Sequence, residues 1–213
     1  MRAATIAATA PSRTIAADAQ ESNAVIARGL KQHDAQLMDQ LIEMYQHRLL
    51  RYLLFLTGRR ELAEDLFQET WMRVLTRGSQ YDGRARFDTW LFTIARNLVI
   101  DSSRKRKLAS LDEMSDNNED AQAFEIASDD PSPLDHLSAG EQSAQLAEVL
   151  LHLDANYREV LSLRFHEELS LEEIAKVTSA PLSTVKSRLY RGLAALRPYL
   201  EALQTERPVE VQI

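Results

Sequence analysis

The sequence predicts an all-α fold of two small helical domains joined by a flexible acidic linker, with the second domain built on a helix-turn-helix. Apolar residues recur at spacings of three and four in two blocks of the chain, as on one face of a helix. Only six Gly and six Pro occur in 213 residues, too few for the tight turns of a sandwich or barrel. A long acidic segment separates the two blocks.

That acidic segment accounts for the overall charge. Residues 108–157 contain no Lys or Arg and hold twelve of the 32 acidic residues, so the formal charge of −7 conceals an excess of basic residues elsewhere. Net charge therefore does not exclude nucleic acid as a partner. Residues 108–139 also carry Asn117, Asn118 and the run 129–133, and such a composition cannot bury enough apolar surface to fold. We expect residues 108–139 to be the linker.

The first predicted domain spans residues 23–107. Its three helices are predicted at residues 37–56, 61–75 and 87–106. A polar loop at residues 79–86 precedes the last helix. Gly58 and Gly78 follow the first two helices, and glycine suits the left-handed conformation that ends a helix. Residues 1–22 lack the apolar core of a signal peptide and are expected to be a disordered tail.

The second predicted domain spans residues 140–200, followed by a tail at 201–213. Glu173 comes three residues after Ser170, the spacing of a capping box, in which the Ser oxygen accepts a backbone N–H and the carboxylate reaches back. A short helix, a turn at 178–180 and a longer helix from Pro181 then form the helix-turn-helix. Two further amphipathic helices precede it.

The longer helix has an apolar side and a polar side. We expect four residues on the buried side: Val185, Leu189, Leu193 and Leu196. The outward side holds small polar and basic residues: Ser183, Thr184, Lys186, Ser187, Arg188 and Arg191. Such groups can reach base edges while the cations neutralise phosphates. The pattern favours a winged-helix-like DNA-binding domain over a helical hairpin with a solvated basic face.

Two segments of the first domain, residues 81–106 and the helix at 61–75, have charge patterns that suggest a binding partner. Aromatic residues are interleaved with cations at Tyr81, Arg84, Arg86, Phe87, Trp90, Arg96, Arg104, Lys105 and Arg106. This composition suits melted DNA, because exposed bases stack on rings and the backbone needs neutralising. The helix at 61–75 is instead acidic and suits a basic protein partner. Buried aromatics, Trp90 in particular, and solvated charged faces are the alternative explanations.

The sequence argues against a disulfide-bonded or metal-binding protein, a membrane-spanning protein and an enzyme. The chain has no Cys, and its five His do not fall at metal-ligand spacings. No apolar run is long enough to span a bilayer. We find no Gly-rich phosphate loop, His–carboxylate cluster or nucleophile motif, and interpret the pairs at 167–168 and 172–173 as solvated helix ends. We expect a cytoplasmic binding protein that is no enzyme, with no catalytic or metal-ligating residue, no cofactor and no small-molecule substrate.

Three strings resemble segments of bacterial sigma-70 family factors and occur in that family's order. Residues 63–70, Ala-Glu-Asp-Leu-Phe-Gln-Glu-Thr, resemble the polymerase-binding segment. Residues 87–97, Phe-Asp-Thr-Trp-Leu-Phe-Thr-Ile-Ala-Arg-Asn, resemble the promoter-melting segment, and residues 171–191 the reader of the upstream element. Without a third folded domain, the chain is most similar to the extracytoplasmic-function (ECF) group.

The resemblance implies a sigma factor that binds core RNA polymerase and directs promoter-specific initiation, with sigma region 2 at 23–107 and region 4 at 140–200. The clamp helices of the largest polymerase subunit would be bound by Asp65, Leu66, Phe67, Gln68 and Glu69. The aromatic and basic set, with Asn97, would melt the minus-ten element of promoter DNA, and the outward residues of the last helix would read the minus-thirty-five element. The flap of the second largest subunit and an anti-sigma factor, membrane-anchored for many family members, are the other implied partners.

A stand-alone helix-turn-helix regulator is the alternative function, but it leaves the acidic helix and the segment around Trp90 without a purpose. One departure from the family concerns the turn, because family members usually carry Gly at the position of Ser179 and often at that of Ser183. A non-Gly residue in a left-handed turn costs roughly 1 kcal/mol.

Overall fold

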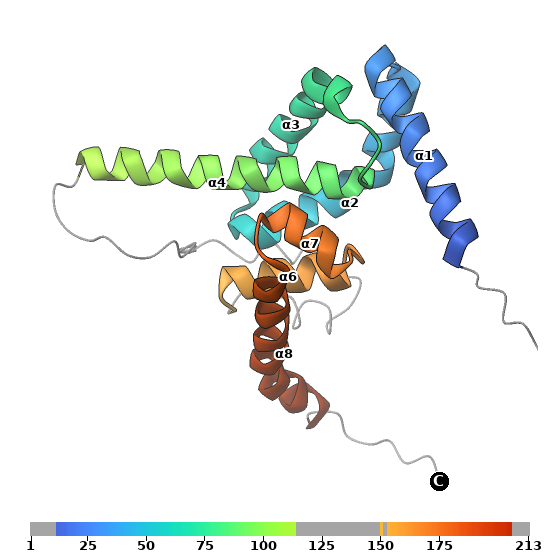
Figure 1. The fold of residues 1–213 in the computed structure, drawn as a ribbon. Helices are drawn as coiled ribbons and strands as arrows, with labels where there is room; N and C mark the ends of the chain where they lie inside the picture. Colours follow the sequence, from blue (N-terminus) through green and yellow to red (C-terminus); the bar gives the residue numbers. More distant parts are fainter. Residues whose placement is uncertain (1–11, 114–149, 151–152, 206–213) are drawn as a thin grey trace, which may run out of the picture.

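The computed structural model describes the backbone of residues 12–113, 150 and 153–205, and the side chains of 21–107, 150 and 153–199. Within these ranges the chain is helical and contains no strand, which confirms the all-α prediction (Figure 1). The first block holds α1 (Ser12–Gln32), α2 (Ala35–Thr57), α3 (Arg60–Arg77), the 3₁₀ turn η1 (Gly78–Gln80) and α4 (Phe87–Glu113). The second block holds α6 (Ala155–Phe165), α7 (Leu171–Thr178) and α8 (Leu182–Thr205).

Local sequence signals define both ends of α2. The Asp34 carboxylate accepts hydrogen bonds from the backbone N–H groups of Gln36 and Leu37, at 3.0 and 3.2 Å, and so caps the helix. Gly58 has φ 63°, and its N–H donates to the Leu54 carbonyl at 2.8 Å. The prediction that Gly58 ends this helix is confirmed.

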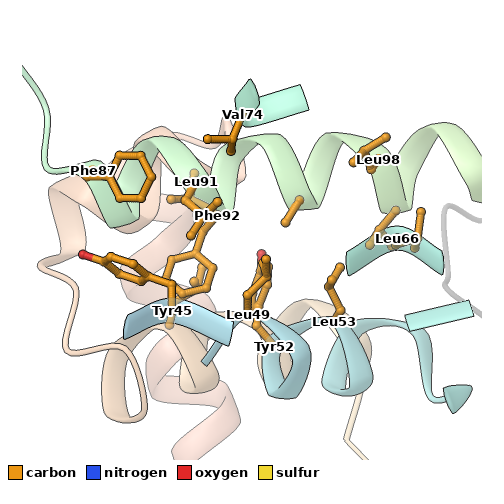
Figure 2. Close-up of a cluster of buried hydrophobic side chains, with 14 of the residues drawn as sticks. Tyr45, Leu49, Tyr52, Leu53, Leu66, Val74, Phe87, Leu91, Phe92 and Leu98 are labelled. Carbon is orange, nitrogen blue, oxygen red and sulfur yellow. The ribbon is translucent and has the colours of Figure 1, made fainter. Parts of the chain in front are cut away.

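The core of the first block lies between α2, α3 and α4 (Figure 2). Leu49 and Leu53 of α2 face Leu91 and Phe92 of α4, and all four are fully buried. Burying a large apolar side chain stabilises a fold by about 1.5–3 kcal/mol, so the packing of α4 against α2 favours the folded block. This packing fixes the first half of α4 against α2.

Two features of the first block differ from the sequence-based expectation. Residues 12–22, expected in a disordered tail, are helical in α1; the segment is rich in Ala, the strongest helix former. Gly78 follows the last residue of α3, as predicted, but its φ of −57° is not the left-handed conformation. A Cβ there would lie 3.2 Å from the Leu30 Cβ, so the glycine makes room for α1.

The acidic segment is described only at its start. The helix α4 continues past Arg106 to Glu113 and so enters the predicted linker, because residues 108–113 include good helix formers such as Leu and Ala. Residues 114–149, which hold the rest of the linker, lie outside the described residues. Most of the first of the two amphipathic helices expected before the helix-turn-helix, at residues 146–153, lies there too.

The second block forms around α7. Val160 and Leu163 of α6, Ile174 of α7 and Val185 of α8 are fully buried. The block does not stand apart from the first: α4 packs against α7, and α2 packs against α6 (Figure 1).

Candidate nucleic-acid interface

The helix-turn-helix is built by α7, a tight turn and α8. At the start of α7, Ser170 Oγ accepts from the Glu173 N–H at 3.2 Å, and the Glu173 carboxylate accepts from the Ser170 N–H at 2.8 Å. The predicted capping box is therefore confirmed. Ser179 ends the helix in the left-handed conformation, with φ 50° and ψ 37°. The turn keeps its geometry with Ser in a position that favours glycine.

The polar side of α8 is exposed as expected. Ser183, Lys186, Ser187 and Arg191 are exposed, while Thr184 and Arg188 are half-buried. On the opposite side Val185 and Leu196 are buried and Leu189 packs partly against the core. Leu193, expected on the buried side, is 38% exposed, whereas its neighbour Gly192 is buried against Tyr157 and Leu161 of α6.

A groove with a volume of about 390 Å³ lies between α8 and the start of α6. From α8 it is lined by Ser183, Thr184, Ser187, Arg188 and Arg191, and from the start of α6 by Asn156, Tyr157 and the capping residue Asp154. Asp154 caps α6 by accepting from the Asn156 N–H at 2.9 Å. The three α6 residues were missed from the sequence, since only the fold brings the start of α6 beside the helix predicted to enter DNA.

The loop before α4 is closed by aromatic packing. Tyr81 and Phe87 are each 2% exposed, with ring centroids 5.7 Å apart, and Trp90 lies 5.2 Å from Tyr81 and is half-buried. Tyr81 and Phe87 present no ring face to a base in this conformation. Gly83 at the loop tip has φ 75° and approaches the Asn23 carbonyl of α1, a position where a side chain would be strained.

The basic residues around this loop and along α4 have different surroundings. Arg84 is 90% exposed and lies 3.4 Å from Asp82. Arg86 is paired with Asp88 and lies 3.8 Å from Glu173 of α7. Arg96 is only 14% exposed, because it donates to Glu159 of α6 at 2.7 Å. Further along α4, four predicted site residues are exposed to solvent: Asn97, Arg104, Lys105 and Arg106.

The acidic side of α3 is exposed. Asp65, Gln68 and Glu69 face solvent, while Leu66 is 7% exposed and Phe67 packs edge-on against Trp71, with centroids 6.3 Å apart. Of the five residues predicted to bind the polymerase, Asp65, Gln68 and Glu69 are therefore accessible to a partner, and Leu66 and Phe67 pack within the first block.

Burial shifts three titratable groups near α6. Burial raises the pKa of Tyr52 well above its ordinary value, and the charge of Glu159 acts in the same direction. Burial lowers the pKa of Arg158 to about 10. Burial, and secondarily the charge of Arg51, lowers the pKa of His166. Tyr52 and Arg158 therefore keep their protons at neutral pH, and His166 is neutral there.

No group of three or more His, Asp or Glu side chains in the described ranges is arranged to hold a metal ion. None of the helices in the part of the chain that the structure describes is long and apolar enough to cross a membrane.

Comparison with known proteins agrees with this geometry. The family model of sigma-70 region 2 matches residues 41–109, and that of sigma-70 region 4 matches residues 143–196. The ECF RNA polymerase sigma factor SigW of Bacillus subtilis (strain 168) is 32% identical over 176 residues, which are 82% of this chain and 94% of that protein.

Two solved structures share the fold. The sigma factor RpoE of Bartonella quintana, crystallised with the anti-sigma factor NepR, has a TM-score of 0.59 at 25% identity, covering 79% of this chain and 98% of that one. CnrH in complex with the cytosolic domain of CnrY also has a TM-score of 0.59, at 22% identity, over 85% and 98% of the two chains.

A chain that is helical wherever the structure describes it, with a helix-turn-helix, a basic helix and an exposed acidic helix, is thus a DNA-binding transcription protein of two blocks. The chain belongs to the sigma-70 family, and within it to the ECF sigma factors that direct promoter-specific transcription initiation. The alternative of a stand-alone regulator is not favoured, because the region 2 match covers α3 and α4 as well.

Proposed function

We propose that the two blocks divide promoter recognition between them, region 2 at residues 23–107 and region 4 at 140–200, with the linker at 108–139. The observation that best supports this proposal is the groove between α8 and the start of α6, because polar and basic side chains of α8 line it. Ser183, Thr184, Lys186, Ser187, Arg188 and Arg191 would read the minus-thirty-five element in the major groove. Arg188, which is half-buried and lines the groove, would contact a base, and exposed Lys186 a phosphate.

The minus-ten element would be bound by the loop before α4 and by α4 itself. The exposed residues Arg84, Asn97, Arg104, Lys105 and Arg106 would hold DNA directly, and Arg86 and Arg96 would join them once freed from their carboxylate partners. Tyr81 and Phe87, which are buried, would support the loop, while the half-buried Trp90 would contact a base with the exposed edge of its ring. Extruding a base costs a few kcal/mol, which a preformed loop offsets.

The exposed side of α3 would bind the clamp helices of the largest polymerase subunit. Asp65, Gln68 and Glu69 supply acceptors for a basic partner, and Leu66 and Phe67 hold the helix against its own core. Region 4 would contact the flap of the second largest subunit.

An anti-sigma factor is the proposed inhibitor, because the structural relatives RpoE and CnrH are seen with NepR and CnrY. We also propose that the chain works in the cytoplasm and that the polymerase, not this chain, performs the chemistry.

Size-exclusion chromatography with purified core RNA polymerase, followed by run-off transcription on genomic fragments, tests this function. We expect co-elution and transcripts that start at defined sites only when the chain is added. Tight binding to duplex DNA without co-elution would contradict the proposal and favour the stand-alone regulator.

A further inference from the structure

The loop between α3 and α4 has a buried side and an exposed side. Its buried residues are Gly78, Tyr81 and Gly83. The residues that face solvent between and after them are polar or basic: Ser79, Gln80, Asp82, Arg84 and Arg86. The surface proposed to meet the minus-ten element therefore depends on what holds the buried side of the loop.

The buried side of the loop packs against α1, and Figure 1 shows the chain running beside α1 on its way from α3 to α4. A Cβ at Gly83 would lie 3.1 Å from the Asn23 carbonyl oxygen and 3.4 Å from the Ala27 Cβ. A Cβ at Gly78 would lie 3.2 Å from the Leu30 Cβ. Asn23, Ala27 and Leu30 are spaced by four and three residues, so one face of α1 contacts both glycines.

The helix α1 offers this loop a fixed surface. Ala27 and Leu30 are buried in the core of the first block. The Asp34 N–H donates to the Gly29 carbonyl at 3.0 Å and closes the turn from α1 into α2. A Cβ at Gly29 would clash with the Leu37 side chain, so this glycine lets α1 lie close to the start of α2.

The conformation of the loop is specific to this contact. Gly83 has φ 75°, in the left-handed region that residues with a Cβ adopt only at a cost. Tyr81, between the two glycines, is buried, and its hydroxyl donates to the Ala85 carbonyl at 2.6 Å. Contacts at Gly78, Tyr81 and Gly83 together fix the path of the loop and hence the position of Arg84.

We infer that the face of α1 formed by Asn23, Ala27 and Leu30 is a positioning surface for minus-ten recognition. It holds the loop so that the exposed loop residues are presented to DNA, and it thereby sets base discrimination without touching DNA itself. The match to the region 2 family model begins at residue 41, after α1. This inference rests on the proposed role of the loop and α4 in binding the minus-ten element.

Gly83→Ala tests the positioning role in the full chain bound to core polymerase. The measurement is base discrimination, defined as run-off transcription from the cognate promoter divided by that from promoters with one base pair changed. A displaced loop lowers this ratio for changes in the minus-ten element and not for changes in the minus-thirty-five element. A protein that is merely less stable gives less transcript from every promoter and keeps both ratios.

We expect Gly83→Ala to lower minus-ten discrimination about tenfold and to leave minus-thirty-five discrimination unchanged, because a small displacement of a positioned group is costly. Gly58→Ala is the matched control, since Gly58 also has a positive φ, 63°, and lies at the end of α2. Parental minus-ten discrimination in Gly83→Ala, or an equal loss in Gly58→Ala, would overturn the inference. A parent chain that directs no promoter-dependent transcription would count against the proposed function instead.

A reversible link between α1 and the loop gives the second test. The chain has no Cys, and the 3.4 Å between the Ala27 Cβ and a Cβ at Gly83 is close to the about 3.5–4.5 Å that separates the Cβ atoms of a disulfide. A27C/G83C should therefore form a disulfide with oxidised glutathione, detected by mass spectrometry, and lose it with a reductant.

We expect reduced A27C/G83C to discriminate minus-ten variants as poorly as Gly83→Ala. The oxidised protein should discriminate better, because the disulfide returns the loop to α1. Three results would each overturn the inference: a disulfide that does not form, an oxidised protein that discriminates no better than the reduced one, or a loss of transcription on oxidation. The last result would mean that the loop must leave α1 to read DNA.

Discussion

The hydroxyl of Tyr81 donates a 2.6 Å hydrogen bond to the backbone carbonyl of Ala85 and closes the loop that carries Arg84 and Arg86. The ring that makes this bond is buried between Phe87 and Trp90. Tyr81, which we expected at a DNA surface from its aromatic character, is therefore buried in this structure and supports the loop that carries Arg84 and Arg86.

Tyr81→Phe removes this hydrogen bond and leaves the carbonyl of Ala85 without it. We expect a loss of about 0.5–1.5 kcal/mol in the free energy of unfolding, measured by urea denaturation. Transcription from a duplex promoter should fall more than transcription from a template with a pre-melted minus-ten element. Tyr190→Phe, at a 71% exposed position, is the control. Unchanged stability in Tyr81→Phe would contradict the supporting role.

Asp65→Lys with Gln68→Lys should abolish co-elution with core polymerase. Both side chains are exposed, so the circular dichroism spectrum and melting temperature should stay as in the parent chain. Gln40→Lys with Glu43→Lys makes the same charge change at two exposed positions of α2 and should leave polymerase binding intact. Retained binding in the α3 variant would refute the assignment of α3.

Arg188→Ala should weaken holoenzyme binding at the cognate minus-thirty-five element by about 1–3 kcal/mol and relax specificity at one base pair. Lys186→Ala should weaken binding equally on all sequences and lower its salt dependence, as expected for a phosphate contact. Competition assays with single base-pair variants distinguish the two effects. Arg197→Ala, exposed on α8 outside the groove, is the control. A uniform loss with Arg188→Ala would make that residue a phosphate contact only.

Ser179→Gly should stabilise the protein by about 0.5–1 kcal/mol, because glycine adopts φ 50° without a Cβ clash. Ser179→Ala keeps the Cβ and should bring no such gain. Chemical denaturation of the two variants side by side measures the difference. If both variants have the same stability, backbone strain at this turn is not the reason glycine is favoured there.

Acidification should weaken the docking of the two blocks through His166. Its pKa is lowered from the ordinary value of 6.5 by burial and by Arg51, while Glu167 beside it is paired with Arg51 and Arg48. The neutral form is thus favoured in the folded state, so its stabilising contribution is complete above pH 6.5 and is lost as pH falls through the lowered pKa.

Urea denaturation between about pH 7.5 and 5.5, a range chosen to bracket the ordinary His pKa, measures this loss. His166→Gln should flatten the dependence, whereas His47→Gln, at an exposed position, should keep it. Identical pH profiles for the parent chain and His166→Gln would contradict the assignment.

Sequence reasoning was most successful where the signal is local. The capping box at Ser170 and Glu173, the left-handed Gly58 and the apolar side of α8 at Val185 depend on residues within one or two turns, and each was predicted from spacing alone. The chain itself, through its helical periodicity and three ordered motifs, determined an all-α sigma factor with two DNA-contacting blocks.

What only the tertiary structure decided is how those blocks meet. Glu167 was interpreted as a solvated helix end, but it is buried against Arg48, which lies 119 positions away in the chain. Periodicity reports which face of a helix is apolar or charged, and it carries no information on what covers that face. The groove beside Asn156, the burial of Tyr81 and the pairing of Arg96 with Glu159 follow from distant segments packing together, because burial and charge pairing are properties of the folded chain.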